Sequence, residues 1–162
     1  FRRVLFRSCP EYYAASAAHD LGHNTEQLFK DFIAERNLRN IPATPGAQEF
    51  THKLREKGYW VQILTARPAD NPLCLFDTAR WIQNSGIYFD DVAFSGEKFR
   101  WIIQSQFSGH VALCVDDSPK HAAEFASHGL KTFSPILPYN SSLSRQEGVI
   151  MVENLDQITN NL

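Results

Sequence analysis

Three groups of side chains in this sequence are of the types that bind a phosphoryl group and a hard cation. They are the hydroxyl of Thr65, the ammonium of Lys98 and the adjacent carboxylates of Asp116 and Asp117. A hydroxyl donates to a phosphoryl oxygen, an ammonium offsets negative charge, and carboxylate oxygens are ligands for Mg²⁺. Each group also has an ordinary structural explanation: Thr65 ends a strand, Lys98 is a solvated lysine, and the acids cap a helix.

The positions of these side chains relative to the predicted strands favour the chemical explanation. The two carboxylates directly follow Val111–Val115, five apolar residues that are typical of a strand buried on both faces of a parallel sheet. Thr65 ends another apolar stretch, and Lys98 follows a third, shorter one. Because the carboxyl ends of parallel strands meet at one edge of a sheet, we expect the three groups to converge on one crevice.

Strand and helix patterns alternate from Phe50 onward, which predicts an α/β fold: a Rossmann-like parallel sheet with helices on both faces. Asn24 or Thr25 is suited to cap a helix that carries Leu28, Phe29, Phe32 and Ile33 on one face. Ser118 is a suitable cap for the helix that starts at Pro119. The predicted strands are 59–64, 92–94, 111–115, 131–133 and 149–152. Further helices are expected at 46–58, 72–86, 119–128 and 155–162, and another follows 95–98 with Trp101 and Ile102 facing inward. Residues 135–145 are expected to form a polar loop.

Composition and charge exclude several classes of function. The 162 residues suffice for one domain, and a net charge of −2 gives no basic excess for binding duplex nucleic acid. No apolar run approaches the roughly 20 residues that a membrane helix needs. The three cysteines are odd in number, which indicates a reduced, cytoplasmic protein, and the scattered histidines do not indicate zinc.

The first eight residues, Phe1–Ser8, do not have the pattern of a domain start. They match, codon for codon, one reading frame of a common short-read sequencing adapter. We therefore expect residues 1–8 to be foreign to the domain, residues 9–44 to form part of a helical cap, and residues 45–162 to form the α/β core. The natural chain is then expected to begin upstream of Cys9 and to be truncated here.

The ordered motifs resemble those of the haloacid dehalogenase-like (HAD-like) phosphohydrolases. Ile63–Pro68 (sequence ILTARP) is similar to the second motif of that superfamily, Gly96–Lys98 to the third and Val115–Pro119 (VDDSP) to the fourth. Gly46–Gly58 is similar to the helix that leads into the second motif. The resemblance covers about Pro45 to Asn140.

The segment Ile136–Asn140 (ILPYN) resembles the loop after the last core strand in 5′-nucleotidase-like members, including deoxyribonucleotidases. A plain turn at Tyr139 and Asn140 is the alternative explanation. This segment favours a nucleotidase-like hydrolase within the superfamily.

The resemblance implies a mechanism and assigns roles to residues. One aspartate attacks phosphorus to form an aspartyl-phosphate, and a second aspartate two residues later protonates the leaving alcohol. Thr65 and Lys98 are then the catalytic candidates of this sequence, and Thr65, Ala66, Arg67 and Lys98 are the substrate-binding candidates. For Arg67, a surface or structural ion pair is the alternative to a substrate contact.

The same resemblance implies a magnesium cofactor and a phosphorylated small molecule as substrate, with a nucleoside monophosphate as the favoured class. Asp116 is expected to bind Mg²⁺, and Asp117 to bind it directly or through water. The helical stretch 12–37 is expected to belong to a small cap insertion that selects the substrate and excludes water. The oligomeric state stays open.

The sequence departs from the superfamily at its first motif, an apolar strand followed by Asp-x-Asp-x-Thr. No Asp-x-Asp occurs upstream of Thr65, where Asp20 and Asp31 are isolated. We therefore expect this polypeptide to be inactive while its intact parent is a phosphatase. The missing strand would leave a slot between strands 59–64 and 111–115, and residues 3–6 have the apolar content to occupy it.

Three alternatives stay open. A sugar-phosphate phosphatase or a polynucleotide 3′-phosphatase of the same superfamily would use the same motifs. A non-catalytic HAD-like binding protein would have lost the nucleophile while keeping the binding residues.

Overall fold

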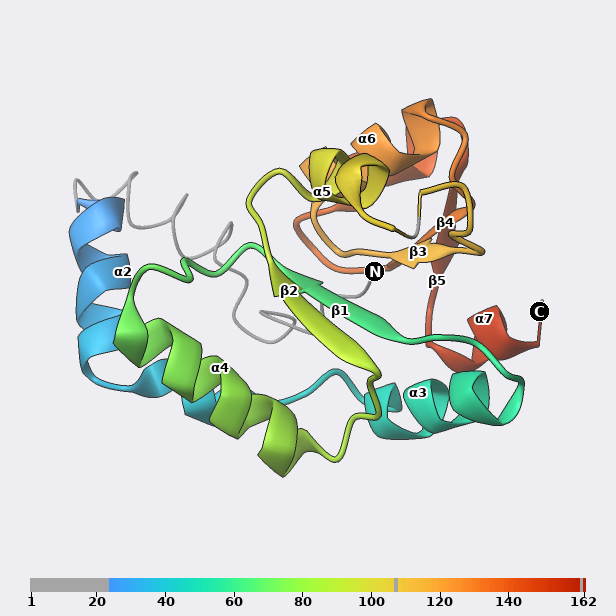
Figure 1. Ribbon diagram of the computed structural model, residues 1–162. Coiled ribbons are helices and arrows are strands. Elements are labelled where there is room, and N and C mark those ends of the chain that lie inside the picture. Colours follow the sequence, from blue (N-terminus) through green and yellow to red (C-terminus); the bar gives the residue numbers. More distant parts are fainter. Residues whose placement is uncertain (1–23, 107, 161) are drawn as a thin grey trace.

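The computed structural model describes residues 24–106, 108–160 and 162 of the chain. The expectations about residues 1–8, about Cys9 and about the first part of the cap segment lie outside these residues. The elements are α2 (Thr25–Ala34), η1 (Asn37–Asn40), α3 (Ala47–Glu56), β1 (Gln62–Thr65), α4 (Pro72–Ser85), β2 (Asp91–Phe94), α5 (Lys98–Gln104), β3 (Cys114–Val115), α6 (Pro119–Ser127), β4 (Thr132–Pro135), η2 (Ser141–Arg145), β5 (Val149–Val152) and α7 (Asp156–Thr159) (Figure 1).

The strands form two parallel ladders. β1 pairs with β2, and the second ladder has the order β3-β4-β5. Within the described part of the chain β1 and β3 are not hydrogen-bonded to each other. This separation agrees with the predicted slot between these two strands, although the segment expected to fill it, residues 3–6, lies outside the described residues.

Alternate residues of β1 and β3 pack into two different apolar clusters. Ile63 and Val115 belong to a larger cluster with residues of α3, α4 and α7, whereas Leu64 and Cys114 pack with residues of α5 and α6. In Figure 1, α5 and α6 lie together on one side of the strands, and α3 and α7 lie on the other side. The predicted α/β class with helices on both faces is therefore confirmed.

Helix boundaries follow the capping residues that the sequence supplies. The Asn24 side chain accepts hydrogen bonds from two backbone N–H groups of α2, and Asn71 does the same for α4, whose first residue is Pro72. Gly86 ends α4 with φ +66°, a left-handed conformation that favours glycine. The expected Ser118 cap is wrong in detail: Ser118 precedes α6, but its hydroxyl makes no capping hydrogen bond.

Two strands, β1 and β3, are shorter than the apolar runs that predicted them. Residues 111–115 were expected to form one buried strand, but β3 contains only Cys114 and Val115, and Ala112 is exposed. β3 is short because of where its partner strand begins. Cys114 lies opposite Thr132, the first residue of β4, and residues 111–113 have no strand residue of β4 opposite them.

Two further expectations need correction. Leu28 was placed on the inward face of α2, but it is exposed, whereas Ile33 of that helix is buried. The stretch 135–145 was expected to be a polar loop, but it contains η2 and buries Asn140 and Leu143. None of the described helices is long and apolar enough to cross a membrane.

Candidate functional site

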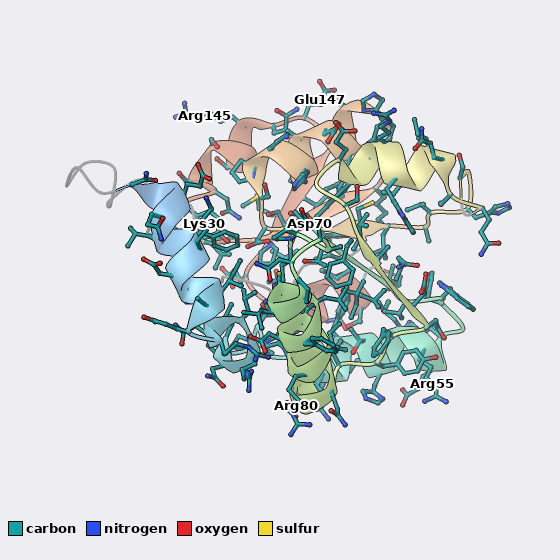
Figure 2. The ribbon with its side chains drawn as sticks, turned by 60° about the vertical axis from the view of Figure 1, so that its left-hand side comes forward. Lys30, Arg55, Asp70, Arg80, Arg145 and Glu147 are labelled. Carbon is teal, nitrogen blue, oxygen red and sulfur yellow. The ribbon has the colours of Figure 1, made fainter. Side chains whose placement is uncertain are left out.

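Charged side chains divide into an exposed majority and a small buried group. Arg55, Arg80, Arg145 and Glu147 are examples of the exposed kind and lie at the periphery of the molecule in Figure 2. The buried aspartate, lysine and arginine side chains of the described region are Arg67, Asp77, Lys98, Asp116 and Asp117. Burying a charge is costly unless it is paired, so each of these needs a structural or functional explanation.

Lys98 and Asp116 form a buried ion pair. Lys98 is the first residue of α5, after β2, and Asp116 directly follows β3. The Nζ atom of Lys98 lies 2.5 Å from Asp116 Oδ2, and each of the two residues is only 1% exposed. The structure therefore brings together two of the predicted site residues, and a solvated Lys98 is excluded.

The second oxygen of Asp116 organises the start of α6. Asp116 Oδ1 accepts a hydrogen bond of 2.9 Å from the backbone N–H of Ser118. This contact closes the turn before α6 but does not cap the helix, because the N–H of Ser118 precedes the first helical residue, Pro119. The carboxylate thus has its orientation fixed from two directions, by the Lys98 ammonium and by the turn that leads into the helix.

Asp117 is buried and contacts the loop after β4. Its Oδ2 accepts a hydrogen bond from the Tyr139 hydroxyl, and its backbone carbonyl accepts one of 3.2 Å from Asn140 Nδ2. The turn that was the alternative for Tyr139 and Asn140 is present, because the backbone N–H of Asn140 donates to the Leu137 carbonyl, but it is not the whole explanation. These two residues contact the acid pair itself.

Thr65 lies at the end of β1 and is buried. Its hydroxyl oxygen accepts a hydrogen bond of 3.3 Å from the backbone N–H of Arg67, and Ala66 between them is half-buried. The Thr65 carbonyl accepts a hydrogen bond of 2.8 Å from the backbone N–H of Ser95. Because Ser95 begins the loop that leads to Lys98, the two loops that carry the predicted phosphate-binding residues are joined at their backbones.

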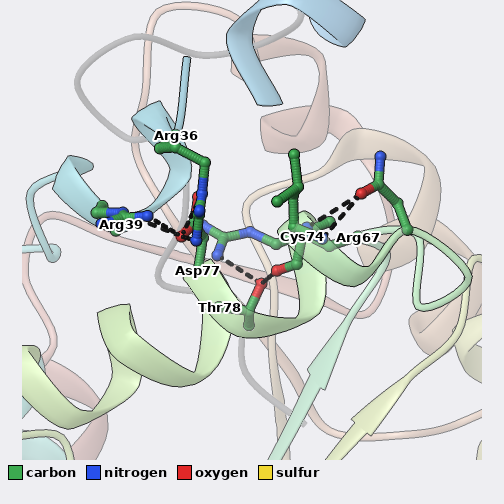
Figure 3. Close-up of polar contacts among 8 residues, drawn as sticks. Arg36, Arg39, Arg67, Cys74, Asp77 and Thr78 are labelled. Carbon is green, nitrogen blue, oxygen red and sulfur yellow. Dashed lines mark hydrogen bonds and ion pairs between the residues drawn. The ribbon is translucent and has the colours of Figure 1, made fainter. Parts of the chain in front are cut away.

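The side chain of Arg67 contacts α4. Its Nη1 donates a hydrogen bond of 2.9 Å to Thr78 Oγ1 (Figure 3). Its guanidinium carbon lies 5.6 Å from the centre of the Trp81 ring. These contacts are structural and hold the loop after β1 against the helix. The surface ion pair that was one alternative for Arg67 is wrong, because the side chain is buried.

Next to Thr78 on the same helix, Asp77 binds two arginines: Arg36, which directly precedes η1, and Arg39 within η1. Arg36 Nη2 and Arg39 Nη2 lie 2.6 Å and 2.9 Å from Asp77 Oδ1 (Figure 3). The hydrogen bond from Arg36 is the main reason why the pKa of Asp77 lies below its usual value. The sequence reasoning missed this cluster. The available signal was an aspartate on the inward stripe of α4, between Cys74 and Trp81.

The donor atoms present are compatible with Mg²⁺ but do not complete its coordination. Among the described residues there is no group of three or more histidine, cysteine, aspartate or glutamate side chains that could hold a metal ion. Mg²⁺ is usually held by one or two carboxylates, with water and phosphate oxygens completing an octahedron. The adjacent, buried carboxylates of Asp116 and Asp117 supply such a minimal set.

The described chain has the α/β fold of HAD-like phosphatases. A comparison with protein-family models gives no match. Among solved structures, a D,D-heptose 1,7-bisphosphate phosphatase from Burkholderia thailandensis superimposes with a TM-score of 0.58, at 17% identity, over 76% of this chain and 88% of that chain. This likeness shows the fold alone.

Among curated proteins, the chain is similar to a "Putative 5'(3')-deoxyribonucleotidase" of Chlorobaculum tepidum. The two are 25% identical over 111 residues, which is 66% of this chain and 51% of that protein. The chain therefore spans about half the length of this relative.

Proposed function

We propose that this chain carries the phosphate-binding and cation-binding half of a nucleotidase-like phosphomonoester hydrolase. The observation that supports the proposal best is the buried Lys98–Asp116 pair, which lies beside Asp117 at the carboxyl end of β3. Such a pair is expensive to bury and contributes little net stability, so a functional reason for it is favoured.

In this proposal each side chain has one task. The Thr65 hydroxyl donates to an oxygen of the phosphoryl group, and the Lys98 ammonium offsets the negative charge that grows on that group. Asp116 and Asp117 would hold Mg²⁺, which when bound supplies positive charge against the phosphoryl oxygens. Arg67 and Thr78 keep the loop after β1 in place, and Ala66 lies where its backbone can approach the substrate.

We also propose that the polypeptide of 162 residues binds phosphate without turnover. Aspartyl-phosphate chemistry needs a nucleophilic carboxylate and a second acid two residues later, and the sequence has no Asp-x-Asp upstream of Thr65. Asp116 does not supply such a pair, because the residue two positions later is Ser118. A non-catalytic binding protein is the second candidate, since the same buried Lys98–Asp116 pair would serve binding alone.

The experiment is phosphate binding measured by ³¹P NMR with and without Mg²⁺, on the wild-type chain and on Asp116→Asn. We expect Mg²⁺-dependent binding that is lost in the variant, and no release of p-nitrophenol or nucleoside from p-nitrophenyl phosphate or nucleoside monophosphates. Turnover of these substrates would refute the inactivity. Phosphate binding that is the same in both proteins would refute the site.

A further inference from the structure

We propose that Tyr139 and Asn140 are positioning residues that hold Asp117 in the orientation needed to bind the cation. This inference rests on the proposed function, because it concerns the same cation site. It adds a second element to that site, the loop between β4 and η2, which the motif residues alone do not include.

Asn140 is the fixed point of this loop. It is fully buried, and its Nδ2 lies 2.8 Å from the Pro135 carbonyl, 3.2 Å from Ser134 Oγ and 3.2 Å from the Asp117 carbonyl. Its Oδ1 accepts a hydrogen bond of 2.9 Å from the backbone N–H of Leu137. One side chain thus ties the end of β4, its own loop and the backbone of Asp117 together.

This set of contacts exceeds what a turn requires. Leu137 N to Asn140 Oδ1 would by itself close a local turn, as asparagine often does. The bond from Asn140 Nδ2 to Asp117 crosses to a different strand end, 23 residues away in sequence. If the Asn140 amide were lost, the Asp117 carbonyl would lose this buried hydrogen-bond donor, which is costly. The position of the Asp117 backbone therefore depends on Asn140.

Tyr139 orients the side chain of Asp117. Its hydroxyl donates to Asp117 Oδ2, so the orientation of the carboxylate is set by a neutral donor, whereas Asp116 beside it is bound to an ammonium. A neutral partner orients a carboxylate without cancelling its charge, which preserves its attraction for a cation. Hydrogen bonds of this kind to a ligand carboxylate typically change metal affinity by 10- to 100-fold.

The test is Tb³⁺ binding by the full chain, with luminescence excited directly at the ion so that loss of a phenol does not alter the readout. The variants are Tyr139→Phe, Asp116→Asn and a matched control, Tyr88→Phe. The control removes a similar Tyr–Asp hydrogen bond, 2.5 Å between the Tyr88 hydroxyl and Asp90 Oδ1, away from the site. Luminescence lifetimes in H₂O and D₂O report how many water molecules the bound ion keeps.

We expect Tyr139→Phe to weaken Tb³⁺ binding by about 10- to 100-fold and to leave more water on the ion, with an unchanged melting temperature. Tyr88→Phe should bind like the wild type. If Tyr139→Phe also binds like the wild type while Asp116→Asn does not bind, the positioning role is refuted and the cation site stands. If the wild type does not bind, or Asp116→Asn binds equally well, the cation site and this inference are both refuted.

Discussion

The described residues contain two buried acidic centres that differ in the kind of partner they have. At the first, Asp116 pairs with one lysine that is almost completely buried, and a second carboxylate, Asp117, lies beside it. At the second, Asp77 is bound by two arginines whose side chains are 37% and 36% exposed.

The difference in exposure separates a candidate site from a structural link. At the first centre an ammonium and a carboxylate are both removed from water, and a second carboxylate lies beside them, a costly arrangement that favours a functional explanation. At the second centre the outer parts of two guanidinium groups stay in water, so the same carboxylate–cation contact serves to link the segment around η1 to α4.

The largest expected effect is that of Lys98→Met, which removes the ammonium and leaves the Asp116 carboxylate buried. We expect the free energy of unfolding to fall by about 3–5 kcal/mol, measured by urea denaturation. The matched control is Lys30→Met, because Lys30 pairs with Glu26 at 2.7 Å on the exposed side of α2. The control should change stability by less than about 0.5 kcal/mol. Equal stabilities of the two variants would contradict a buried pair.

Asp77→Asn should have a smaller effect on stability. We expect a loss of about 1–2 kcal/mol, because the exposed guanidinium groups of Arg36 and Arg39 can turn into water when the carboxylate is removed. Phosphate binding should be retained, since Asp77 is not part of the proposed site. Asp156→Asn, which removes an exposed partner of Lys53 at 2.6 Å, is the control and should be close to neutral. Loss of phosphate binding in Asp77→Asn would show that the two centres are coupled.

The same aspartate predicts a pH dependence. Since the pKa of Asp77 in the folded protein lies below its usual 3.8, its contribution to stability is present above that value. That contribution is lost as the pH falls below 3.8 through the folded pKa, because the unfolded chain then binds the proton more readily. Urea denaturation between pH 5 and pH 3 should therefore show a smaller decrease in the free energy of unfolding for Asp77→Asn than for the wild type. Parallel curves would contradict the depressed pKa.

The smallest expected effect concerns Cys114 in β3. Burial raises the pKa of its thiol from the usual 9.0 to about 11. A raised folded pKa means that stability is fully present below pH 9.0 and declines as the pH rises toward 11, where the unfolded thiol has already ionised. Cys114→Ala should remove that part of the alkaline decline, measured by denaturation at pH 8 and pH 10. An identical decline of stability in the variant would refute the raised pKa of Cys114.

The sequence could predict the strand-end residues because their positions depend on local patterns. Apolar stretches that end at Thr65 and at Asp116 define strand ends, and parallel pairing brings such ends to one edge of a sheet. The buried state of Lys98 and its contact with Asp116 follow from that geometry. The fold class was predictable for the same reason, because helix and strand periodicities alternate along the chain.

Other features depend on partners that are distant in sequence. Asp77 is bound by Arg39 and Arg36, which lie 38 and 41 residues earlier in the sequence. No local pattern predicts which residues make that contact. The shortness of β3 depends on where β4 begins, and the Asn140 contact with Asp117 depends on how the loop after β4 folds back. Tertiary pairing, which a single sequence does not display, decides all three.

The most direct test of the proposed site is Mg²⁺-dependent binding of inorganic phosphate by the wild-type chain, followed by ³¹P NMR, with Asp116→Asn and Asp77→Asn measured beside it. The assignment of the two acidic centres predicts that the wild type and Asp77→Asn bind phosphate when Mg²⁺ is present and that Asp116→Asn does not. Binding that is retained in Asp116→Asn, or lost in Asp77→Asn alone, would contradict this assignment.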